Sequence, residues 1–340
     1  KIVIVAGGTG GHVFPAVSLS EQLLSEGKKI LFFSDTRVSR IINSNIDLFK
    51  NKNIKLYNFY ISKSFNFINY FKNFFKIFFI LGKENPKVII GFGGYTSIPS
   101  LIAAKLLFKP IVLHEQNIII GSTNKFFFPF SQKIIFGLGD KNNKKNNKKI
   151  FFIRNPVRKK ILFYRKKVNF NFSKDKINIL VFGGSQGASL IDYKLPKAIS
   201  LLPILIKKKI NIFHQCSKKN LKLVKKEYLK NNLKANCKIF FYNMPEIIFK
   251  SQFVISRSGA SSLSEITALG KPAILIPYKF SKNEHQLKNA KWFVKNGAGS
   301  YLNENGLTEN KLKLKIHDFI KNKKKLKKMS LNSFSLWDDK

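Results

Sequence analysis

The sequence contains few cysteines, and no apolar run in it is long enough to span a membrane. Its 340 residues include two cysteines, Cys216 and Cys237, too few for a disulfide framework or a cysteine-rich metal site. This usage is typical of a reducing compartment such as the cytoplasm. No apolar run reaches the roughly 18–20 residues of a membrane-spanning helix, and the first residues lack the pattern of a secretory signal peptide. The sequence therefore predicts neither a disulfide-stabilised secreted domain nor a membrane-spanning one.

Acidic residues are also scarce, with 18 Asp and Glu against 62 Lys and Arg, which gives a net charge of +44. One interpretation is a polyanionic partner, either nucleic acid or an anionic membrane surface. The other is compositional drift, because lysine, asparagine, isoleucine and phenylalanine dominate and all four have A- and T-rich codons. The lysines are spread over almost every surface segment, and no nucleic-acid-binding signature is present. We expect drift to explain most of the charge, an anionic membrane surface to explain some of it, and nucleic acid to be no partner.

Several catalytic motifs are missing as well. The sequence has no Asp-x-Asp pair for a divalent metal, no His/Cys cluster for zinc, no G-x-S-x-G elbow and no Walker lysine loop. We therefore expect no metal and no cofactor. If the ligand carries a diphosphate, helix N-termini and arginine would neutralise its charge.

What the sequence does contain is a repeated order of apolar strand, glycine or serine turn, and helix. It occurs in "KIVIVAGGTGGHVFPAVSLSEQLL", "KVIIGFGGYTSIPSLIAAKLL", "INILVFGGSQGASLIDYKL" and "FVISRSGASSLSEITALG". Strands that alternate with helices predict an α/β fold with doubly wound parallel sheets. Two repeats fall in each half, and a polar loop at 139–149 separates the halves. We expect Rossmann-like domains at 1–155 and 156–325, facing each other, and a basic tail at 326–340.

The segment 64–87 is rich in phenylalanine and predicts a helix. Its expected core-facing residues recur at helical spacing and are Phe67, Ile68, Phe71, Phe74, Phe75 and Phe78. Phe65, Tyr70 and Phe79 point elsewhere on this helix, and Lys72 and Lys76 lie between the aromatics. Exposed aromatics beside lysines suit a membrane interface, so the segment is either an ordinary packed helix or a membrane-contacting one.

The first turn resembles a dinucleotide-binding loop only in part. Gly8 and Gly10 fit the G-x-G-x-x-G pattern, but Val13 stands where a third small residue is needed. Asp35 ends the second strand, where a ribose-binding acid would lie, so a nicotinamide-dependent oxidoreductase remains one alternative. His12 lies at a helix N-terminus, which disfavours a positive imidazole. A neutral histidine there can accept a proton from a substrate hydroxyl.

Polar side chains follow the other strands, where parallel sheets bind ligands. "HEQN" offers Glu115 as an acid or base and Asn117 as a hydrogen-bonding group. "RNPVR" offers Arg154 and Arg158, whose guanidinium groups can bind phosphate. The remaining candidates are Ser185 in "GGSQGA", Glu265 in "SRSGASSLSE", and Glu284, His285, Gln286 and Asn289 in "NEHQLKNA".

Taken together, "GGTGGHVFPA", "GFGGYTSIPS", "LHEQN", "RNPVR", "GGSQGA" and "SRSGASSLSEITALGKPAILIPY" resemble the MurG family. These are the peptidoglycan N-acetylglucosaminyltransferases that act on undecaprenyl-diphospho-N-acetylmuramoyl-pentapeptide. The resemblance runs from residue 1 to about 300. It implies a GT-B fold with the active site between two Rossmann-like domains, and UDP-N-acetylglucosamine as donor. It also implies a lipid-linked acceptor at the cytoplasmic face of the bacterial inner membrane, and catalysis without metal.

The resemblance also implies roles for individual residues. Thr9, Gly10 and Gly11 match the first donor-contacting loop, Asn117 matches the asparagine of HEQN, and Arg158 and Ser185 match residues near the donor diphosphate. Phe241 falls where backbone atoms hold uracil, and Gln286 matches a glutamine that contacts the sugar. The stretch around the nucleotide is matched by Ala260, Ser261, Ser262, Leu263, Ser264 and Glu265, with Glu265 on the ribose. His12 and Glu115 match the candidates for acid–base work.

The expected reaction is a single displacement at the anomeric carbon, in which the acceptor C4 hydroxyl attacks opposite UDP and inverts α to β. A base must take the hydroxyl proton while the leaving diphosphate is stabilised electrostatically. Sequence alone leaves open whether His12 or Glu115 is that base. Three alternatives also remain: another GT-B transferase, the nicotinamide-dependent oxidoreductase, and a basic module that binds membrane or nucleic acid.

Overall fold

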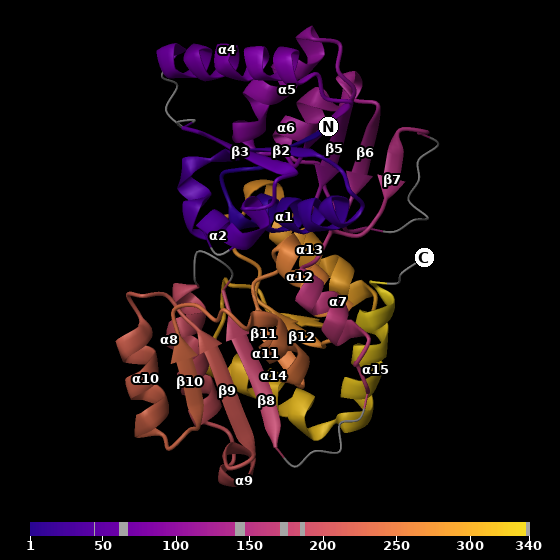
Figure 1. Ribbon diagram of the computed structural model, residues 1–340. Helices are drawn as coiled ribbons and strands as arrows, with labels where there is room; N and C mark the ends of the chain where they lie inside the picture. Colours follow the sequence, from indigo (N-terminus) through magenta and orange to yellow (C-terminus); the bar gives the residue numbers. More distant parts are fainter. Residues whose placement is uncertain (44, 61–66, 140–146, 171–175, 184–187, 338–340) are drawn as a thin grey trace. The chain divides into compact units, whose positions relative to one another are not determined.

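The chain folds as two compact units, Lys1–Lys159 and Lys160–Lys340. The structure, a computed structural model, describes residues 1–43, 45–60, 67–139, 147–170, 176–183 and 188–337. Each unit contains one parallel β-sheet with helices on both faces (Figure 1). The predicted fold class, α/β with doubly wound parallel sheets, is confirmed. The division falls four residues after the predicted limit at residue 155.

The sheet of the first unit has seven parallel strands among the described residues, in the order β3-β2-β1-β4-β5-β6-β7. Their bounds are β1 Ile2–Val5, β2 Ile30–Asp35, β3 Ile54–Phe59, β4 Val88–Gly91, β5 Ile111–Glu115, β6 Lys133–Phe136 and β7 Ile150–Phe152. The strand order reverses between β1 and β4. At such a switch point the loops that leave the carboxyl ends of two strands diverge, and parallel α/β sheets bind their ligands there.

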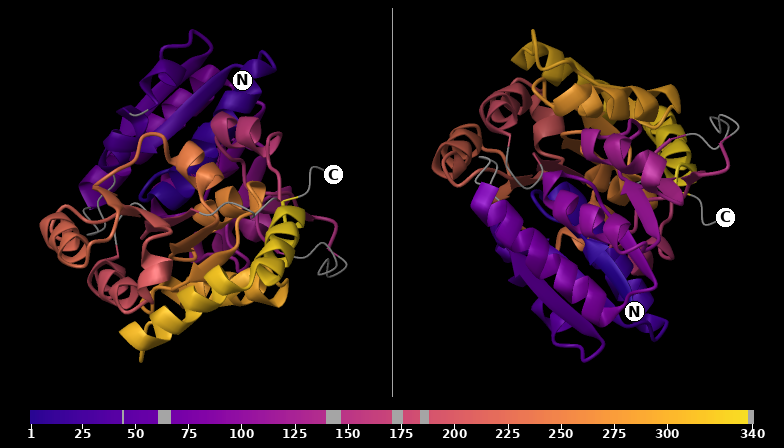
Figure 2. Two further views of the ribbon diagram at one scale, coloured as in Figure 1. Left: turned by 90° about the horizontal axis from the view of Figure 1, so that it is seen from below. Right: turned by 90° about the horizontal axis from the view of Figure 1, so that it is seen from above.

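Both faces of this sheet are covered, which explains why its central strands β1 and β4 are apolar. Along β1, Val3 and Val5 enter the core under α4 and α5, whereas Ile4 enters the core on the opposite face. The helix α1 supplies Val13 and further residues to that second core. In Figures 1 and 2, α4 and α5 lie on one side of the strands and α1 lies on the other.

The helices of the first unit are short, apart from α1 and α4. Their bounds are α1 Gly10–Ser25, α2 Ser39–Asn43, α3 Ile46–Phe49, α4 Phe67–Glu84, α5 Ile98–Leu106 and α6 Ser122–Phe127, with 3-10 turns at Thr36–Val38, Tyr95–Ser97 and Phe128–Phe130. No helix among the described residues combines the length and the apolar character needed to cross a membrane.

The helix α4 presents only part of its predicted face to the core, where Phe74 and Phe78 pack as expected. Ile77 and Leu81 are fully buried, whereas Phe71 and Phe75, predicted as core residues, are 55% and 52% exposed. Phe79 is 70% exposed as expected. Phenylalanines occupy nearly every side of this helix, so their spacing alone does not define the buried face. Tyr70 is half-buried, and Phe65 lies outside the described residues.

The sheet of the second unit has six parallel strands among the described residues, in the order β10-β9-β8-β11-β12-β13. Their bounds are β8 Ile177–Phe182, β9 Ile210–Gln215, β10 Ala235–Lys238, β11 Phe253–Ser256, β12 Ala273–Leu275 and β13 Gly299–Tyr301. The order reverses between β8 and β11, so this unit has a switch point equivalent to that of the first.

The helices of the second unit are α7 Lys159–Arg165, α8 Ser189–Ser200, α9 Ile204–Lys207, α10 Leu221–Lys230, α11 Met244–Lys250, α12 Ala260–Ala268, α13 His285–Lys295, α14 Glu309–Lys321 and α15 Lys323–Ser335, with a 3-10 turn at Lys282–Glu284. The first of them, α7, begins at the last residue of the first unit.

The residues expected as a basic tail form most of α15. Leu326 and Met329 are buried in the core of the second unit, and the Ser333 hydroxyl donates to the Lys271 carbonyl at 2.9 Å. Arg165 of α7 donates to the Ala268 carbonyl at 2.8 Å and lies 3.7 Å from the Phe334 ring centre. The helix α15, yellow in Figure 2, is therefore an integral element of this unit.

Candidate active site

Three loops meet at the switch point of the first unit: β1–α1, β4–α5 and β5–α6. Their closeness requires glycine at position 7. A Cβ added to Gly7 would lie 2.9 Å from the Asp35 Cβ and 2.9 Å from the Thr96 Oγ1, closer than real Cβ contacts allow. Gly93 and Gly94 adopt φ of +80° and +76°, in the left-handed region that favours glycine. The glycines let these backbones approach one another.

The helix α1 begins in this loop cluster. Thr9, in extended conformation, precedes it and makes no side-chain cap hydrogen bond, and its carbonyl accepts from the His12 and Val13 N–H groups. Thr9 and Gly11 are exposed, whereas Gly10 is buried. A sixteen-residue helix with its first turn at a glycine loop favours negative charge through its aligned peptide dipoles.

His12 contacts a residue that sequence reasoning did not single out. Its Nδ1 lies 2.8 Å from the Gln116 Oε1, although 104 positions separate the two residues. The Gln116 Nε2 lies 3.1 Å from the Phe92 carbonyl, 3.0 Å from the His114 carbonyl and 3.1 Å from the His114 Nδ1. Gln116 is 2% exposed, so this glutamine links β4, β5 and α1 inside the unit.

His114 is a second imidazole in this cluster. It is 3% exposed and stacks on Phe92 with ring centres 4.7 Å apart. Burial, reinforced by the nearby His12, lowers the pKa of His114 from 6.5 to about 3. His114 is therefore neutral at physiological pH and adds no positive charge beside His12.

The Glu115 carboxylate is occupied by its own loop. Oε1 accepts from the Asn117 backbone N–H at 3.1 Å and from its side-chain amide at 3.0 Å. Oε2 accepts from the Gly121 N–H at 2.8 Å and from the Asn124 amide at 2.9 Å. Glu115 is 2% exposed. The arrangement fixes the loop between β5 and α6 and orients the Asn117 side chain.

Asp35, the acid at the end of β2, is also engaged. Its carboxylate accepts from the Arg37 Nε and Nη2, both at 2.6 Å, and from the Arg37 backbone N–H at 2.8 Å. The Arg37 guanidinium lies 4.9 Å from the Tyr95 ring centre. A ribose diol would have to displace a bidentate arginine from a carboxylate that is 1% exposed. This engagement disfavours the dinucleotide interpretation of the first turn.

Arg158 lies at the end of the first unit, with its guanidinium carbon 5.8 Å from the Phe14 ring centre. The neighbouring Lys159 backbone hydrogen-bonds to Glu21 of α1. Burial raises the pKa of Glu21, and the charges of Lys159 and Arg158 oppose that rise. Arg158 is thus held beside α1.

The second unit repeats the arrangement of strand, turn and helix with other residues. The helix α12 begins at Ala260, shortly after β11. The residues predicted to contact the nucleotide differ in how far they are buried. Ala260, Leu263 and Ser264 are buried, and the Ser264 hydroxyl donates to the Ala260 carbonyl at 2.8 Å. Ser261, Ser262 and Glu265 are partly exposed. The buried members can offer only backbone atoms to a ligand.

Gln286, predicted near the sugar, lies in the first turn of α13. Its Oε1 accepts from the Tyr278 N–H at 3.0 Å, and its carbonyl accepts from the Ser258 hydroxyl at 2.7 Å. Sequence reasoning missed the neighbouring pair of Arg257 and Glu304, which is 2.6 Å apart and buried. The pair ties the end of β11 to the segment after β13.

Phe241, predicted to present backbone atoms, is buried in the segment between β10 and α11. Its N–H donates to the Gln215 Oε1 at 3.0 Å. Gln215 ends β9 and was not predicted as a site residue. Ser185, in the turn after β8, lies outside the described residues.

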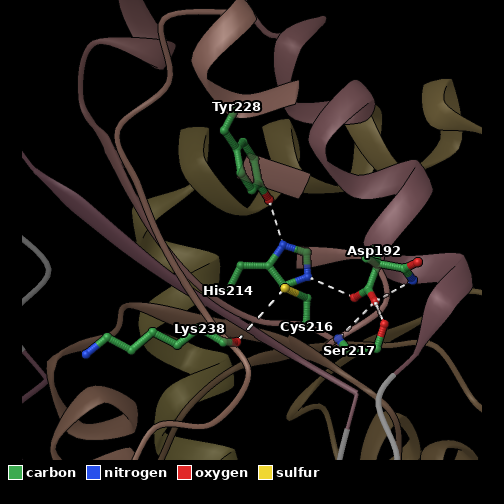
Figure 3. A network of polar contacts seen from close by, with 7 residues as sticks. Asp192, His214, Cys216, Ser217, Tyr228 and Lys238 are labelled. Carbon is green, nitrogen blue, oxygen red and sulfur yellow. Dashed lines mark hydrogen bonds and ion pairs between the residues drawn. The ribbon is translucent and has the colours of Figure 1, made fainter. Parts of the chain in front are cut away.

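Figure 3 shows a buried polar network around His214, the residue that precedes Gln215 in β9. The His214 Nε2 lies 3.3 Å from the Asp192 Oδ1, and the His214 Nδ1 lies 3.1 Å from the Tyr228 hydroxyl. The Asp192 Oδ2 accepts from the Ser217 N–H and hydroxyl and from the Asn220 amide. Burial alone would raise the pKa of Asp192, but the hydrogen bonds lower it below its usual value. The network holds the loop between β9 and α10.

The two cysteines belong to the same core and are not reactive. Burial raises the pKa of Cys216 to about 12 and that of Cys237 to about 11, so neither is a thiolate at neutral pH. Within the described ranges, no group of three or more His, Cys, Asp or Glu side chains could hold a metal ion.

Known proteins resemble the chain along nearly its whole length. Residues 2–136 match the model of the glycosyltransferase family 28 N-terminal domain, and residues 178–337 match that of the C-terminal domain. A protein of Wolbachia sp. subsp. Drosophila simulans (strain wRi) is 35% identical over 337 residues, covering 97% of this chain and 92% of that protein. One of Rickettsia canadensis (strain McKiel) is 37% identical over 346 residues, covering 98% and 94%.

Both relatives are named UDP-N-acetylglucosamine--N-acetylmuramyl-(pentapeptide) pyrophosphoryl-undecaprenol N-acetylglucosamine transferase. Among solved structures, that of Acinetobacter baumannii MurG is similar with a TM-score of 0.77 and 25% identity, covering 98% of this chain and 95% of that one.

Proposed function

The chain belongs to glycosyltransferase family 28 and has the GT-B fold, and from this premise we propose that it completes a lipid-linked peptidoglycan precursor. It transfers N-acetylglucosamine from UDP-N-acetylglucosamine to the C4 hydroxyl of undecaprenyl-diphospho-N-acetylmuramoyl-pentapeptide, and it forms a β-1,4 bond. The observation that carries the proposal is the extent of the likeness. Relatives named as this transferase align with 97–98% of the chain, through both domains and both switch points.

The chemistry we propose is one inverting displacement. The acceptor O4 forms a bond to C1 of the donor sugar while the bond from C1 to the diphosphate oxygen breaks, and that electron pair leaves with UDP. The O4 proton moves to a protein base. UDP is a stable anion and leaves without taking a proton, so one base suffices.

We assign the role of base to His12. The His12 imidazole at the start of α1 can accept a proton from a substrate hydroxyl. Glu115 is the weaker candidate because its two oxygens already accept from Asn117, Gly121 and Asn124. A proton transferred to that carboxylate would cost it these hydrogen bonds. Glu115 instead keeps its loop in the shape that presents Asn117.

For the donor, we propose that the second unit binds the nucleotide. The backbone near Phe241 holds the uracil, the start of α12 faces the phosphates, Glu265 binds the ribose diol and Gln286 contacts the sugar. Ser185 is assigned to the donor diphosphate. In the first unit, we assign Arg158 to phosphate binding, and Thr9, Gly10, Gly11 and Asn117 to contacts with substrate. Helix N-termini and the guanidinium neutralise the leaving charge, so the reaction proceeds without a divalent metal.

We further propose that the enzyme works peripherally at the cytoplasmic face of the bacterial inner membrane, where its lipid acceptor lies. The support is a set of exposed or partly exposed side chains on the first unit, here called the aromatic–lysine face: Phe71, Phe75 and Phe79 of α4, the residues Phe108, Phe126 and Phe130, and Lys105 and Lys109. Phe108 is 94% exposed, and the Lys105 Nζ lies 3.3 Å from the Phe130 ring centre. Exposed aromatics among lysines suit anionic lipid headgroups.

A transfer assay tests the proposed function. Purified protein is supplied with radiolabelled UDP-N-acetylglucosamine and a short-chain lipid acceptor, with EDTA in one arm and magnesium in the other. We expect labelled lipid product at the same rate in both arms. A folded protein that yields no labelled lipid would refute the transferase activity, and a product that forms only with magnesium would refute metal independence.

A further inference from the structure

Gln116 is the buried glutamine that joins His12 to the core of the first unit. The orientation of its side-chain amide follows from its neighbours. The Nε2 lies 3.1 Å from the Phe92 carbonyl and 3.0 Å from the His114 carbonyl. If the amide were rotated by 180°, its oxygen would face those two carbonyl oxygens, and buried acceptors would confront one another without a hydrogen. The amide nitrogen must therefore face the carbonyls, and Oε1 must face His12.

This orientation determines which nitrogen of His12 carries the proton. The Gln116 Oε1 can only accept a hydrogen bond, and it lies 2.8 Å from the His12 Nδ1. Nδ1 must therefore be the donor, and in a neutral imidazole Nε2 then holds the lone pair. A Cβ added to Gly94 would lie 3.5 Å from this Nε2, so the basic edge of the ring lies along the left-handed glycine turn after β4.

We propose that Gln116 is a positioning residue that fixes His12 as the Nδ1–H tautomer, with Nε2 presented as the proton acceptor. The proposal rests on the proposed function, in which His12 takes the acceptor proton. Gln116 plays the part that a buried carboxylate plays in hydrolase triads, where the carboxylate holds the imidazole tautomer and orientation. A neutral amide sets the tautomer without adding negative charge to a site that binds diphosphates.

His114 supports this arrangement from the other side. Its Nδ1 lies 3.1 Å from the Gln116 Nε2, and the ring is held by stacking on Phe92. A protonated His114 would repel the Gln116 amide hydrogens and His12 together. Burial keeps His114 neutral, and with the proton on Nε2 its Nδ1 accepts from the Gln116 amide in the orientation described above.

The direct test is the tautomer of His12, measured from 15N chemical shifts of the imidazole nitrogens in the full-length wild-type protein at pH 8, with the signal assigned by its loss in His12→Gln. We expect a protonated Nδ1 and an unprotonated Nε2. A wild-type Nε2–H tautomer, or an equal mixture of the two, would overturn the proposal, and this measurement requires no variant to stay active.

Gln116→Met gives the functional readout, because methionine keeps the length and bulk but cannot accept from Nδ1. We expect the tautomer preference to be lost and kcat to fall about 10–100-fold, as for other residues that orient a reactive group. The KM for UDP-N-acetylglucosamine should change less than threefold. In a His12→Gln background, Gln116→Met should lower kcat no further, because it acts through His12.

Gln215→Met is the matched control, since Gln215 is a buried glutamine of the other unit. It should leave the His12 signals unchanged and raise the KM for the donor, because it releases the Phe241 N–H. A fall in kcat for Gln116→Met with an unchanged His12 tautomer would overturn the positioning role. If His12→Gln kept wild-type kcat, the assignment of His12 as base would fail, whichever tautomer the 15N shifts report.

Discussion

At the scale of single residues, two buried groups next to each other in the sequence have different tasks. Gln116 sets the tautomer of the His12 ring on another element, whereas the Glu115 carboxylate accepts hydrogen bonds from the segment that follows it. The sequence marked "HEQN" as a site because four polar residues follow an apolar strand. It did not identify Gln116, because the importance of a glutamine depends on which atoms it touches, and His12 lies 104 positions away.

His12→Gln and Glu115→Gln should affect different quantities. Loss of a general base lowers kcat by about 10²–10⁴-fold, and His12→Gln should do so with little change in melting temperature. Glu115→Gln puts an amide nitrogen where a carboxylate oxygen accepts from backbone and side-chain donors. It should lower the melting temperature and raise the donor KM through Asn117. Steady-state kinetics and thermal melting on both variants check this, and a larger kcat loss for Glu115→Gln would reverse the assignment of the base.

His114 should make folding stability depend on pH. Its pKa falls from 6.5 in the unfolded chain to about 3 in the folded one, so between these values the unfolded state binds more protons. The contribution of neutral His114 to the free energy of unfolding is fully present above pH 6.5. It is lost as the pH falls toward 3, by at most about 1.4 kcal/mol per pH unit.

His114→Phe keeps a ring beside Phe92 but removes the titrating group. The free energy of unfolding in urea should therefore fall more steeply for the wild type than for His114→Phe as the pH is lowered from 7 to 4. A pH-independent difference between the wild type and His114→Phe would contradict the account.

At the scale of elements, the four predicted turns correspond to the segments after β1, β4, β8 and β11. The central strands were predictable because they are apolar throughout and end at glycine or serine. The edge strands β7 and β13 were not, because three residues give no period to detect. The buried face of α4 was assigned wrongly in part, because phenylalanine occupies both its core side and its exposed side.

Asp192 should stabilise the loop between β9 and α10. Asp192→Asn places amide hydrogens where the carboxylate accepts from Ser217 and Asn220, and it removes the charge beside His214. Breaking such a buried network costs about 2–4 kcal/mol, which urea unfolding followed by circular dichroism would measure.

Asp318→Asn is the control for this loss, since the Asp318–Lys325 pair is exposed and such pairs contribute about 0–1 kcal/mol. Equal losses for the two variants would show that the buried network does not stabilise the loop.

At the scale of the whole molecule, the net charge of +44 identifies no partner by itself, because the lysines are spread over both units. The aromatic–lysine face is a more specific feature, since exposed phenylalanines gather on α4 and next to α5 and α6. Sequence predicted that Phe79 is part of an aromatic surface on this segment, but not that Phe71 and Phe75 are, because these two fit a core stripe equally well.

Phe79→Glu should weaken binding to vesicles that contain anionic phosphatidylglycerol, because it removes apolar contact and adds repulsion. Co-sedimentation at 0.15 M salt should show at least a tenfold loss of partitioning. Leu314→Glu makes the same kind of change at a residue of α14 that is 65% exposed, and it should reduce partitioning much less. Equal losses for the two variants would mean that binding depends on charge alone, and would contradict the proposal that the aromatic–lysine face contacts the membrane.

The central claim is that the chain joins N-acetylglucosamine to the C4 hydroxyl of a lipid-linked muramoyl acceptor with inversion. NMR of the product made from 13C-labelled UDP-N-acetylglucosamine tests it most directly. The anomeric coupling constant reports the configuration, and the correlation from the labelled C1 across the new bond reports which hydroxyl is substituted. The account predicts a β-linked sugar on C4 of the muramoyl residue. An α-linked product, attachment at another hydroxyl, or free N-acetylglucosamine as the main product would contradict it.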